Sequence, residues 1–197
     1  MARTVDPERH RQRRLQIIDA AFTVFAERGV AGATTAAICR QARIGSGTLF
    51  HYFATKTDIV LAVLALGVEE TRQFAERLSD VTDGIEALDR IVDYVLADAP
   101  DPRAAGFVQA IAGVMTDPPI AAALAADDAA QRDLVSYWVG VAARQGRIRV
   151  DLSADRITSW LLLLFNGFLE RVAADASFDA RNEAELLRET VFGFLRP

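Results

Sequence analysis

The sequence predicts an all-α protein of about nine helices, with a small N-terminal group of three helices followed by a larger helical region. Over most of the chain, apolar residues recur at spacings of three and four, the period of a helix with one buried face. Glycine, proline and capping residues separate the periodic segments. Strand-like alternation is confined to a short stretch around Ile148 and Val150, which we interpret as a connecting loop.

Each helix is bounded by a recognisable start or stop signal. The first helix is expected to follow unstructured residues 1–8 and to end at Gly29, and a break is expected at Pro100 to Pro102. The helices expected, in order, cover residues 9–28, 35–41, 46–53, 57–79, a segment capped by Asp83, 103–116, 120–145, 154–174 and 184–195. Thr34 and Ser46 are expected to cap the second and third helices.

Composition points to a protein of one or two domains in a reducing compartment. Hydrophobic residues make up 51% of the 197 residues, and the single Cys39 excludes an intrachain disulfide. No signal peptide is recognised. The apolar run from Trp160 to Leu169 is shorter than the ~20 residues that span a bilayer. We therefore expect a soluble cytoplasmic protein without a membrane partner.

Residues 34–56 read as two short helices joined by the turn at Ala42, Arg43 and Ile44, which is a helix-turn-helix pattern. On the second of these helices Leu49 and Phe53 share one face, which we assign to the core. The other face presents Thr48, Phe50, His51 and Tyr52. Aromatic and hydrogen-bonding side chains on an exposed helix suit the major groove of DNA. After it, Thr55 and Asp58 form a capping signature beside Lys56, which we expect to contact a phosphate.

The charge distribution agrees with nucleic-acid binding. The net charge of −5 divides into +5 for residues 1–56 and −10 for the remainder. An acidic body with a basic segment is typical of a protein that holds nucleic acid through one part only. The basic run that ends at Arg14 is either a solvated helix start or an arm that reaches phosphates or the minor groove.

The run from about Leu15 to Leu64 resembles the DNA-binding domain of the TetR family of bacterial transcription regulators. Ten positions agree with the pattern of that family: Thr35, Ile38, Ala42, Ser46, Gly47, Thr48, Leu49, Tyr52, Phe53 and Lys56. The chain departs from the pattern at Cys39, Arg43, Ile44, Phe50 and Ile59. Phe50 lacks the hydroxyl of the tyrosine that is frequent at its position.

The resemblance implies a ligand-responsive regulator without enzymatic activity, most simply a repressor that binds a palindromic operator as a homodimer and is released by a small, largely apolar effector. Residues 1–56 would form the DNA-binding domain, and residues 57–197 the effector-binding and dimerisation domain. The residues predicted to contact DNA are Thr34, Thr35, Arg43, Ser46, Gly47, Thr48, Phe50, His51, Tyr52 and Lys56. The operator and the effector are not specified by the sequence.

The larger domain contains candidates for the effector site and for the dimer contact. Residues predicted to line the effector site are Tyr94, Phe107, Met115, Trp138 and Trp160. The last two helices carry more apolar residues than one core face needs, which favours a two-fold four-helix bundle with a second copy. Residues predicted at this interface are Leu161, Phe165, Phe168, Leu169, Leu187, Val191 and Phe194.

Two other functional classes are weighed against a regulator. An enzyme is disfavoured because the two histidines, His10 and His51, both lie in the N-terminal region. No phosphate-binding loop or metal-ligand spacing occurs, so no cofactor and no metal is expected. A helical adaptor that binds protein through the face of Phe50, His51 and Tyr52 is the alternative. Salt distinguishes the two, because DNA binding weakens steeply as ions are added.

Overall fold

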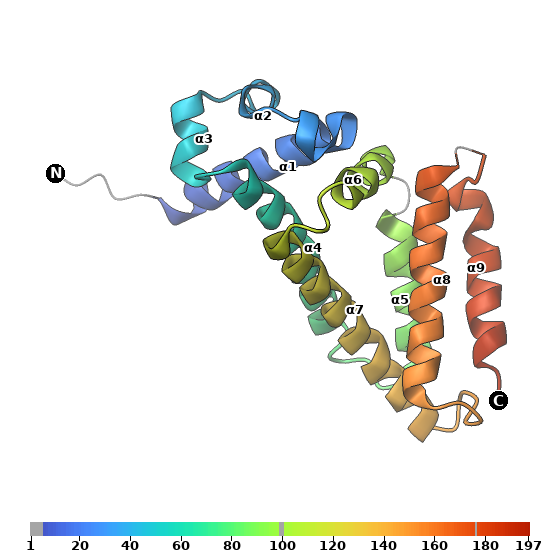
Figure 1. Cartoon of the computed structure of the whole chain (residues 1–197). Helices are drawn as coiled ribbons and strands as arrows, with labels where there is room; N and C mark the ends of the chain where they lie inside the picture. Colours follow the sequence, from blue (N-terminus) through green and yellow to red (C-terminus); the bar gives the residue numbers. More distant parts are fainter. Residues whose placement is uncertain (1–5, 99–100, 176) are drawn as a thin grey trace. The chain divides into compact units, whose positions relative to one another are not determined.

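The computed structural model describes residues 6–98, 101–175 and 177–197, and this part of the chain forms nine α-helices without any strand (Figure 1). The all-α prediction is therefore confirmed. The helices are α1 (Pro7–Gly32), α2 (Thr35–Ala42), α3 (Ser46–Tyr52), α4 (Lys56–Arg77), α5 (Gly84–Asp98), α6 (Pro102–Ala112), α7 (Pro118–Arg144), α8 (Ala154–Ala174) and α9 (Ala180–Leu195). The first helix begins at Pro7, earlier than expected, because Asp6 caps it. Residues 1–5 and the expected break at Pro100 lie outside the described residues.

The chain divides into two compact units. The first unit comprises Met1–Leu66 and Gly106–Leu124, and the second comprises Gly67–Ala105 and Ala125–Pro197. Helix α4 contributes residues to both. The boundary predicted between residues 56 and 57 separates a DNA-binding domain from an effector-binding and dimerisation domain. These functional assignments stay a prediction.

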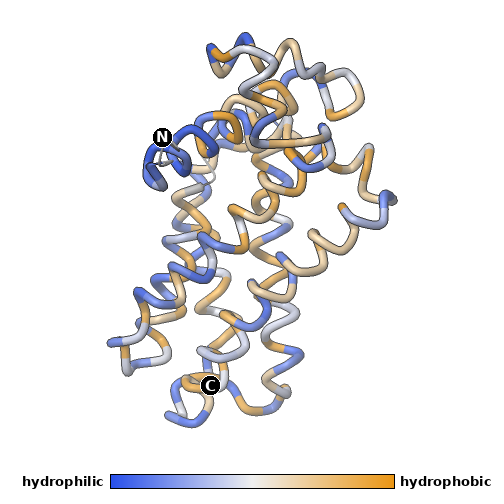
Figure 2. Tube along the Cα trace, turned by 90° about the vertical axis from the view of Figure 1, so that its left-hand side faces the viewer, coloured by the Kyte–Doolittle hydropathy of each residue, from blue (hydrophilic) through white to orange (hydrophobic). Residues whose placement is uncertain are grey.

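The first unit has a core built from the apolar faces of α1 to α4. Ile17, Phe25, Ile38, Leu49 and Ile59 are fully or almost fully buried there. They come from α1 to α4, where their spacing places them on one face of each helix. Figure 2 shows the corresponding change between hydrophobic and hydrophilic residues along the helices.

A glycine allows α6 to pack directly on α1 in this unit. A Cβ atom added at Gly106 would lie 2.3 Å from the carbonyl oxygen of Ala26. Every other residue type would force the two helices apart.

The second unit is a helical bundle in which α8 and α9 run side by side (Figure 1). Its core contains Leu88, Ile91, Val139, Leu161 and Val191, all of which are almost completely buried. Two further contacts join helices distant in the sequence: Gly84 packs against the backbone of Ala142, and Arg188 of α9 pairs with Asp89 and Asp93 of α5. These contacts fix the position of α5 between α7 and α9.

Helix α8 is long and apolar enough, by length and composition, to cross a membrane, although its most apolar run looked too short in the sequence. Ile157, Leu161, Leu162 and Phe165 of α8 belong to the core of the second unit. A core helix of a folded domain has the same composition, because one face is buried by its own chain.

Candidate nucleic-acid interface and ligand cavity

The helix-turn-helix begins with a capped α2 and a strained turn. The hydroxyl of Thr34 accepts a hydrogen bond from the backbone N–H of Ala37 at 3.1 Å, as predicted. Arg43 ends α2 in the left-handed conformation, with φ of 53°, a region that glycine adopts without cost. The expected cap at Ser46 was wrong: Gly45 is the N-cap of α3 and gives no side-chain hydrogen bond, while Ser46 is already the first helical residue.

Helix α3 has one buried face and one exposed face. Leu49 and the following Phe53 are buried in the core with Ile38, as the sequence predicted. The exposed side chains include Ser46, Thr48, Phe50 and His51, and 53% of the surface of Phe50 is accessible. Tyr52, by contrast, is half-buried. A short helix therefore displays an aromatic ring, two hydroxyls and an imidazole on a rigid support.

A contact that the sequence did not predict joins α1 to the end of α3. The rings of His10 and Tyr52 lie 4.5 Å apart between centroids, and His51 meets both of them edge-on at 6.2 Å and 5.2 Å. The only signal for His10 in the sequence was its place in the basic run before the first helix. In the same run, the guanidinium of Arg14 stacks on the ring of Phe53 at 5.2 Å.

The start of α4 carries the predicted capping signature. The backbone N–H of Thr55 donates to the carboxylate of Asp58 at 2.8 Å, and the N–H of Asp58 donates to the hydroxyl of Thr55 at 3.1 Å. These reciprocal bonds form a capping box. They fix the chain direction immediately after α3.

Lys56 has a role that was not expected. Its ammonium group donates to the carbonyl oxygens of Val30 at 2.6 Å, Ala33 at 3.0 Å and Ala31 at 3.4 Å. An ammonium group can donate three hydrogen bonds, and these three carbonyls at the end of α1 are their acceptors. The phosphate contact of Lys56 stays a prediction, and the bonds show that the side chain also ties α4 to α1.

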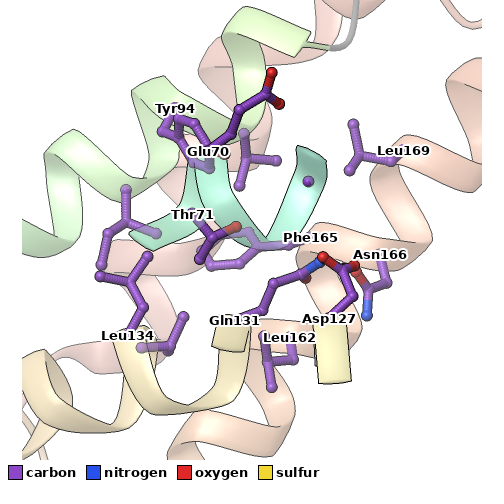
Figure 3. Close-up of a pocket in the computed structure, with 14 residues that line it drawn as sticks. Glu70, Thr71, Tyr94, Asp127, Gln131, Leu134, Leu162, Phe165, Asn166 and Leu169 are labelled. Carbon is purple, nitrogen blue, oxygen red and sulfur yellow. Dashed lines mark hydrogen bonds between the residues drawn. The ribbon is translucent and has the colours of Figure 1, made fainter. Parts of the chain in front are cut away.

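The second unit contains a cavity of about 160 Å³, partly open to solvent, between α4, α5, α7 and α8 (Figure 3). Its walls are mainly apolar and include Phe165, Leu162 and Leu134. The side chains of Thr71 and Asp127 also reach this space. A concave and largely apolar site with a few convergent polar groups is the usual form of a small-molecule site.

The polar part of the cavity is built around Asp127. Its carboxylate accepts a hydrogen bond from the amide of Gln131 at 2.8 Å. Burial, and then the charge of Asp128, raise the pKa of Asp127 above its ordinary value of 3.8. Asp127 forms no ion pair within the part of the chain that the structure describes.

The structure brings only one of the five predicted effector residues to this cavity. Tyr94 lines it, stacked on Phe74 with 4.3 Å between ring centroids. Trp138 is buried in the core, Met115 and Trp160 are about half exposed, and Phe107 packs against Phe22 in the first unit. Aromatic residue type alone did not reveal which side chains share a cavity.

The residues predicted at a dimer contact lie mostly on the inner face of α8 and α9. Five of them are buried within the same chain: Leu161, Phe165, Phe168, Leu187 and Val191. Leu169 and Phe194 are half-buried, and Phe194 packs against Trp160 and Arg149. The exposed apolar side chains of these helices are instead Trp160, Leu163 and Leu186. The sequence showed two apolar faces without showing which one turns inward.

Known proteins resemble this chain both in the helix-turn-helix region and over most of its length. Residues 17–63 match the family described as bacterial regulatory proteins, tetR family. The chain is 27% identical to the HTH-type transcriptional regulator UidR of Escherichia coli K12 over 185 residues, which cover 92% of each protein. It is 25% identical to the HTH-type transcriptional repressor AcnR of Corynebacterium efficiens over 181 residues, or 90% of each. The structure of FadR from Bacillus subtilis in complex with stearoyl-CoA is similar in fold, with a TM-score of 0.75, 20% identity and coverage of 92% of this chain and 99% of that one.

Proposed function

This chain belongs to the TetR family of transcription regulators, and from that premise we propose that it is a repressor that binds a palindromic operator as a homodimer and releases it when a small effector occupies the cavity of the second unit. The repressor name of AcnR and the ligand complex of FadR support this choice. We place its action in the cytoplasm, where a bacterial regulator meets DNA.

The exposed face of α3 carries the proposal. Phe50 is a large apolar side chain held in solvent, next to the exposed Thr48 and His51. A phenyl ring can contact thymine methyl groups, and the hydroxyl and imidazole can donate to base edges or phosphates. Thr34, Thr35, Arg43 and the start of α3 provide the flanking contacts.

Dimerisation is proposed through the outer faces of α8 and α9. Trp160 and Leu163 are exposed on α8, and Leu186 is exposed on α9. Gly167 and Gly193 lie within the same two helices, and a Cβ atom added at either would meet nothing within 4 Å. Glycine weakens a helix by about 1 kcal/mol relative to alanine, and no neighbour among the described residues requires a glycine at either position. Close approach of a partner helix supplies one, in a self-complementary two-fold contact.

Helix α4 provides the proposed coupling between effector and DNA. Its first residue, Lys56, is bonded to the end of α1, and further along it Gly67 and Thr71 line the cavity. A ligand that displaces the cavity-lining part of α4 changes the setting of the helix-turn-helix, because one helix contains both. Ligand and DNA then alter each other's affinity by the same factor.

DNA selection from a genomic pool tests the function. Bound fragments are expected to share a palindrome, and the affinity should fall steeply with salt, by about 0.9 log unit per log unit of salt for each phosphate contacted. Phe50→Ala should weaken binding about tenfold or more, since it removes a base contact. Tyr137→Ala, which removes an exposed aromatic ring from the second unit, is the matched control and should stay within about twofold of the unchanged protein.

The same measurement separates a regulator from a protein-binding adaptor. An adaptor would use Phe50 for an apolar contact with protein, which salt does not weaken. Absence of any selected palindrome at low salt would contradict the proposed function.

A further inference from the structure

We propose that the cavity of the second unit takes a small organic cation, an amine with a compact apolar body whose ammonium group pairs with Asp127. The inference rests on the proposed function, because it names the chemical class of the effector. It follows from three properties of the cavity: its charge, an unused hydroxyl and its size.

The charge of the lining is negative only. Asp127 of α7 and Glu70 of α4 contribute carboxylates, and no arginine, lysine or histidine is among the lining residues that the structure describes. Asp127 is half-buried without an ion pair, so its charge is poorly solvated in the empty cavity. A ligand cation would supply the missing partner, whereas a ligand anion would meet repulsion from Asp127.

A second polar group points to a ligand independently of the carboxylates. Thr71 is 95% buried, since only 5% of its surface is accessible, and its oxygen points toward the centre of the lining residues (Figure 3). Its hydroxyl forms no hydrogen bond with any other residue in the described part of the chain. The oxygen of Thr71 is not among the completely buried side-chain atoms that lack a partner, so it is accessible from the cavity. A ligand or water in the cavity can therefore bond it.

The polar acceptors converge from three helices. Thr71 lies on α4, Asp127 on α7 and Asn166 on α8, and all three side chains line the same cavity (Figure 3). A primary ammonium donates three hydrogen bonds and accepts none. A carboxylate, a hydroxyl oxygen and an amide oxygen are therefore a matching set of acceptors. Gly67 keeps room for this group, because a Cβ there would lie only 3.3 Å from the carboxylate of Asp127.

The rest of the cavity sets the size of the ligand. Its volume of about 160 Å³ is close to that of an engineered protein cavity that holds benzene, about 150 Å³. Phe165, Leu134 and Leu162 provide apolar walls for the body of the ligand. The face of an aromatic ring also attracts a nearby cation.

Matched pairs of ligands test this inference on the full-length, DNA-free protein. Calorimetric titration compares benzylamine with benzyl alcohol, cyclohexylmethylamine with cyclohexylmethanol, and isopentylamine with isopentanol. Within each pair the shape is nearly constant and the charge changes. At least one amine is expected to bind about tenfold or more tightly than its alcohol, because a charge-assisted hydrogen bond in a half-buried site is strong.

Two neighbouring carboxylates provide a matched control. Asp127→Asn is expected to abolish the preference for the amine, while Asp128→Asn should retain it, because Asp128 is exposed and pairs with Arg132 outside the cavity lining. Thr71→Val should weaken amine binding about fivefold. Equal or tighter binding of all three alcohols, equal effects of the two Asp→Asn changes, or no binding of any amine at millimolar concentration would overturn the inference.

Failure here is distinguishable from failure of the proposed function. Operator binding without any amine binding would overturn the cation and leave the regulator. Amine binding without any operator would leave the ligand class and overturn the regulator.

Discussion

Asp127 is a carboxylate that the second unit half-buries without an ion pair in the described chain. Burial disfavours its charged form, and the nearby charge of Asp128 adds repulsion, so the pKa of Asp127 is raised from 3.8. A group that costs stability without a ligand is characteristic of a binding site rather than of a structural core.

The raised pKa gives a prediction about stability and pH. The folded chain binds this proton more tightly than the unfolded chain, so folding stability falls as pH rises from 3.8 through the raised pKa. The loss is complete once the pH lies above the raised pKa. Asp127→Asn removes the charge and should therefore raise the unfolding temperature at pH 7, with a smaller gain near pH 4. Thermal unfolding of both proteins at the two pH values checks this, and a variant that is less stable at pH 7 would contradict it.

Residue type in the sequence indicated only part of this site. Residue type does not distinguish Asp127 from Asp128, because both are acids at neighbouring positions of one helix. The structure separates them, because only Asp127 turns toward the cavity while Asp128 pairs with Arg132. Neighbouring helical residues point in directions about 100° apart, and only packing decides which direction is the interior.

At the scale of elements, Lys56 connects the start of α4 to the end of α1. The end of a helix leaves carbonyl groups without partners, and a lysine ammonium can satisfy them. Here the helical path is broken at Gly29, whose φ is 68°, and the ammonium bonds carbonyls of the residues that follow. The side chain of Lys56 therefore ties the start of α4 to the end of α1.

We expect Lys56→Met to lower the free energy of unfolding by about 1.5–3 kcal/mol, because it keeps the aliphatic stem but removes hydrogen bonds made by a charged group. From the sequence we expect Lys56 only to contact a phosphate, whereas the structure gives it bonds to the end of α1. Arg11→Met removes an exposed charge from the same unit and should change stability by no more than about 0.5 kcal/mol. Urea denaturation measures both variants, and equal stabilities would show that the bonds of Lys56 contribute nothing.

Most helices could be predicted from the sequence because residues next to their ends determine where they begin and stop. Thr34, Asp83 and the pair of Thr55 and Asp58 all accept the capping bonds that the sequence indicated. The predicted cap of the third helix was wrong. Ser46 is a common capping residue type, but in the structure it is the first residue of the helix and Gly45 is the N-cap. Arg43 in this turn adopts the left-handed conformation, which the local preference of arginine does not predict.

At the scale of the whole molecule, the two helices at the C-terminal end have two apolar faces. One is buried within the chain and includes Leu161 and Val191. The other exposes Trp160, Leu163 and Leu186, whose exposed fractions are 49%, 58% and 58%. An exposed apolar stripe of this kind is typical of a surface that another protein covers.

Leu163→Glu is expected to convert the proposed dimer into monomers and to weaken operator binding strongly. Two-fold symmetry would place one buried, unpaired carboxylate from each subunit in the apolar contact. Val150→Glu places the same charge on another exposed apolar residue of the second unit, 78% accessible, and should leave the assembly unchanged. Sedimentation equilibrium and DNA titration measure the two properties. A dimer that survives Leu163→Glu would exclude this face as the contact.

The sequence alone determined the helical class, the helix-turn-helix with its buried Leu49 and exposed Phe50, and the family, because each depends on short-range periodicity, capping and motif spacing. Tertiary structure decided which residues share a space. It placed Thr71, Asp127 and Asn166 around one cavity, gave Lys56 to the end of α1, and turned Phe165 inward and Leu163 outward. These features depend on contacts between residues far apart in the chain, and their geometry exists only once the helices have packed.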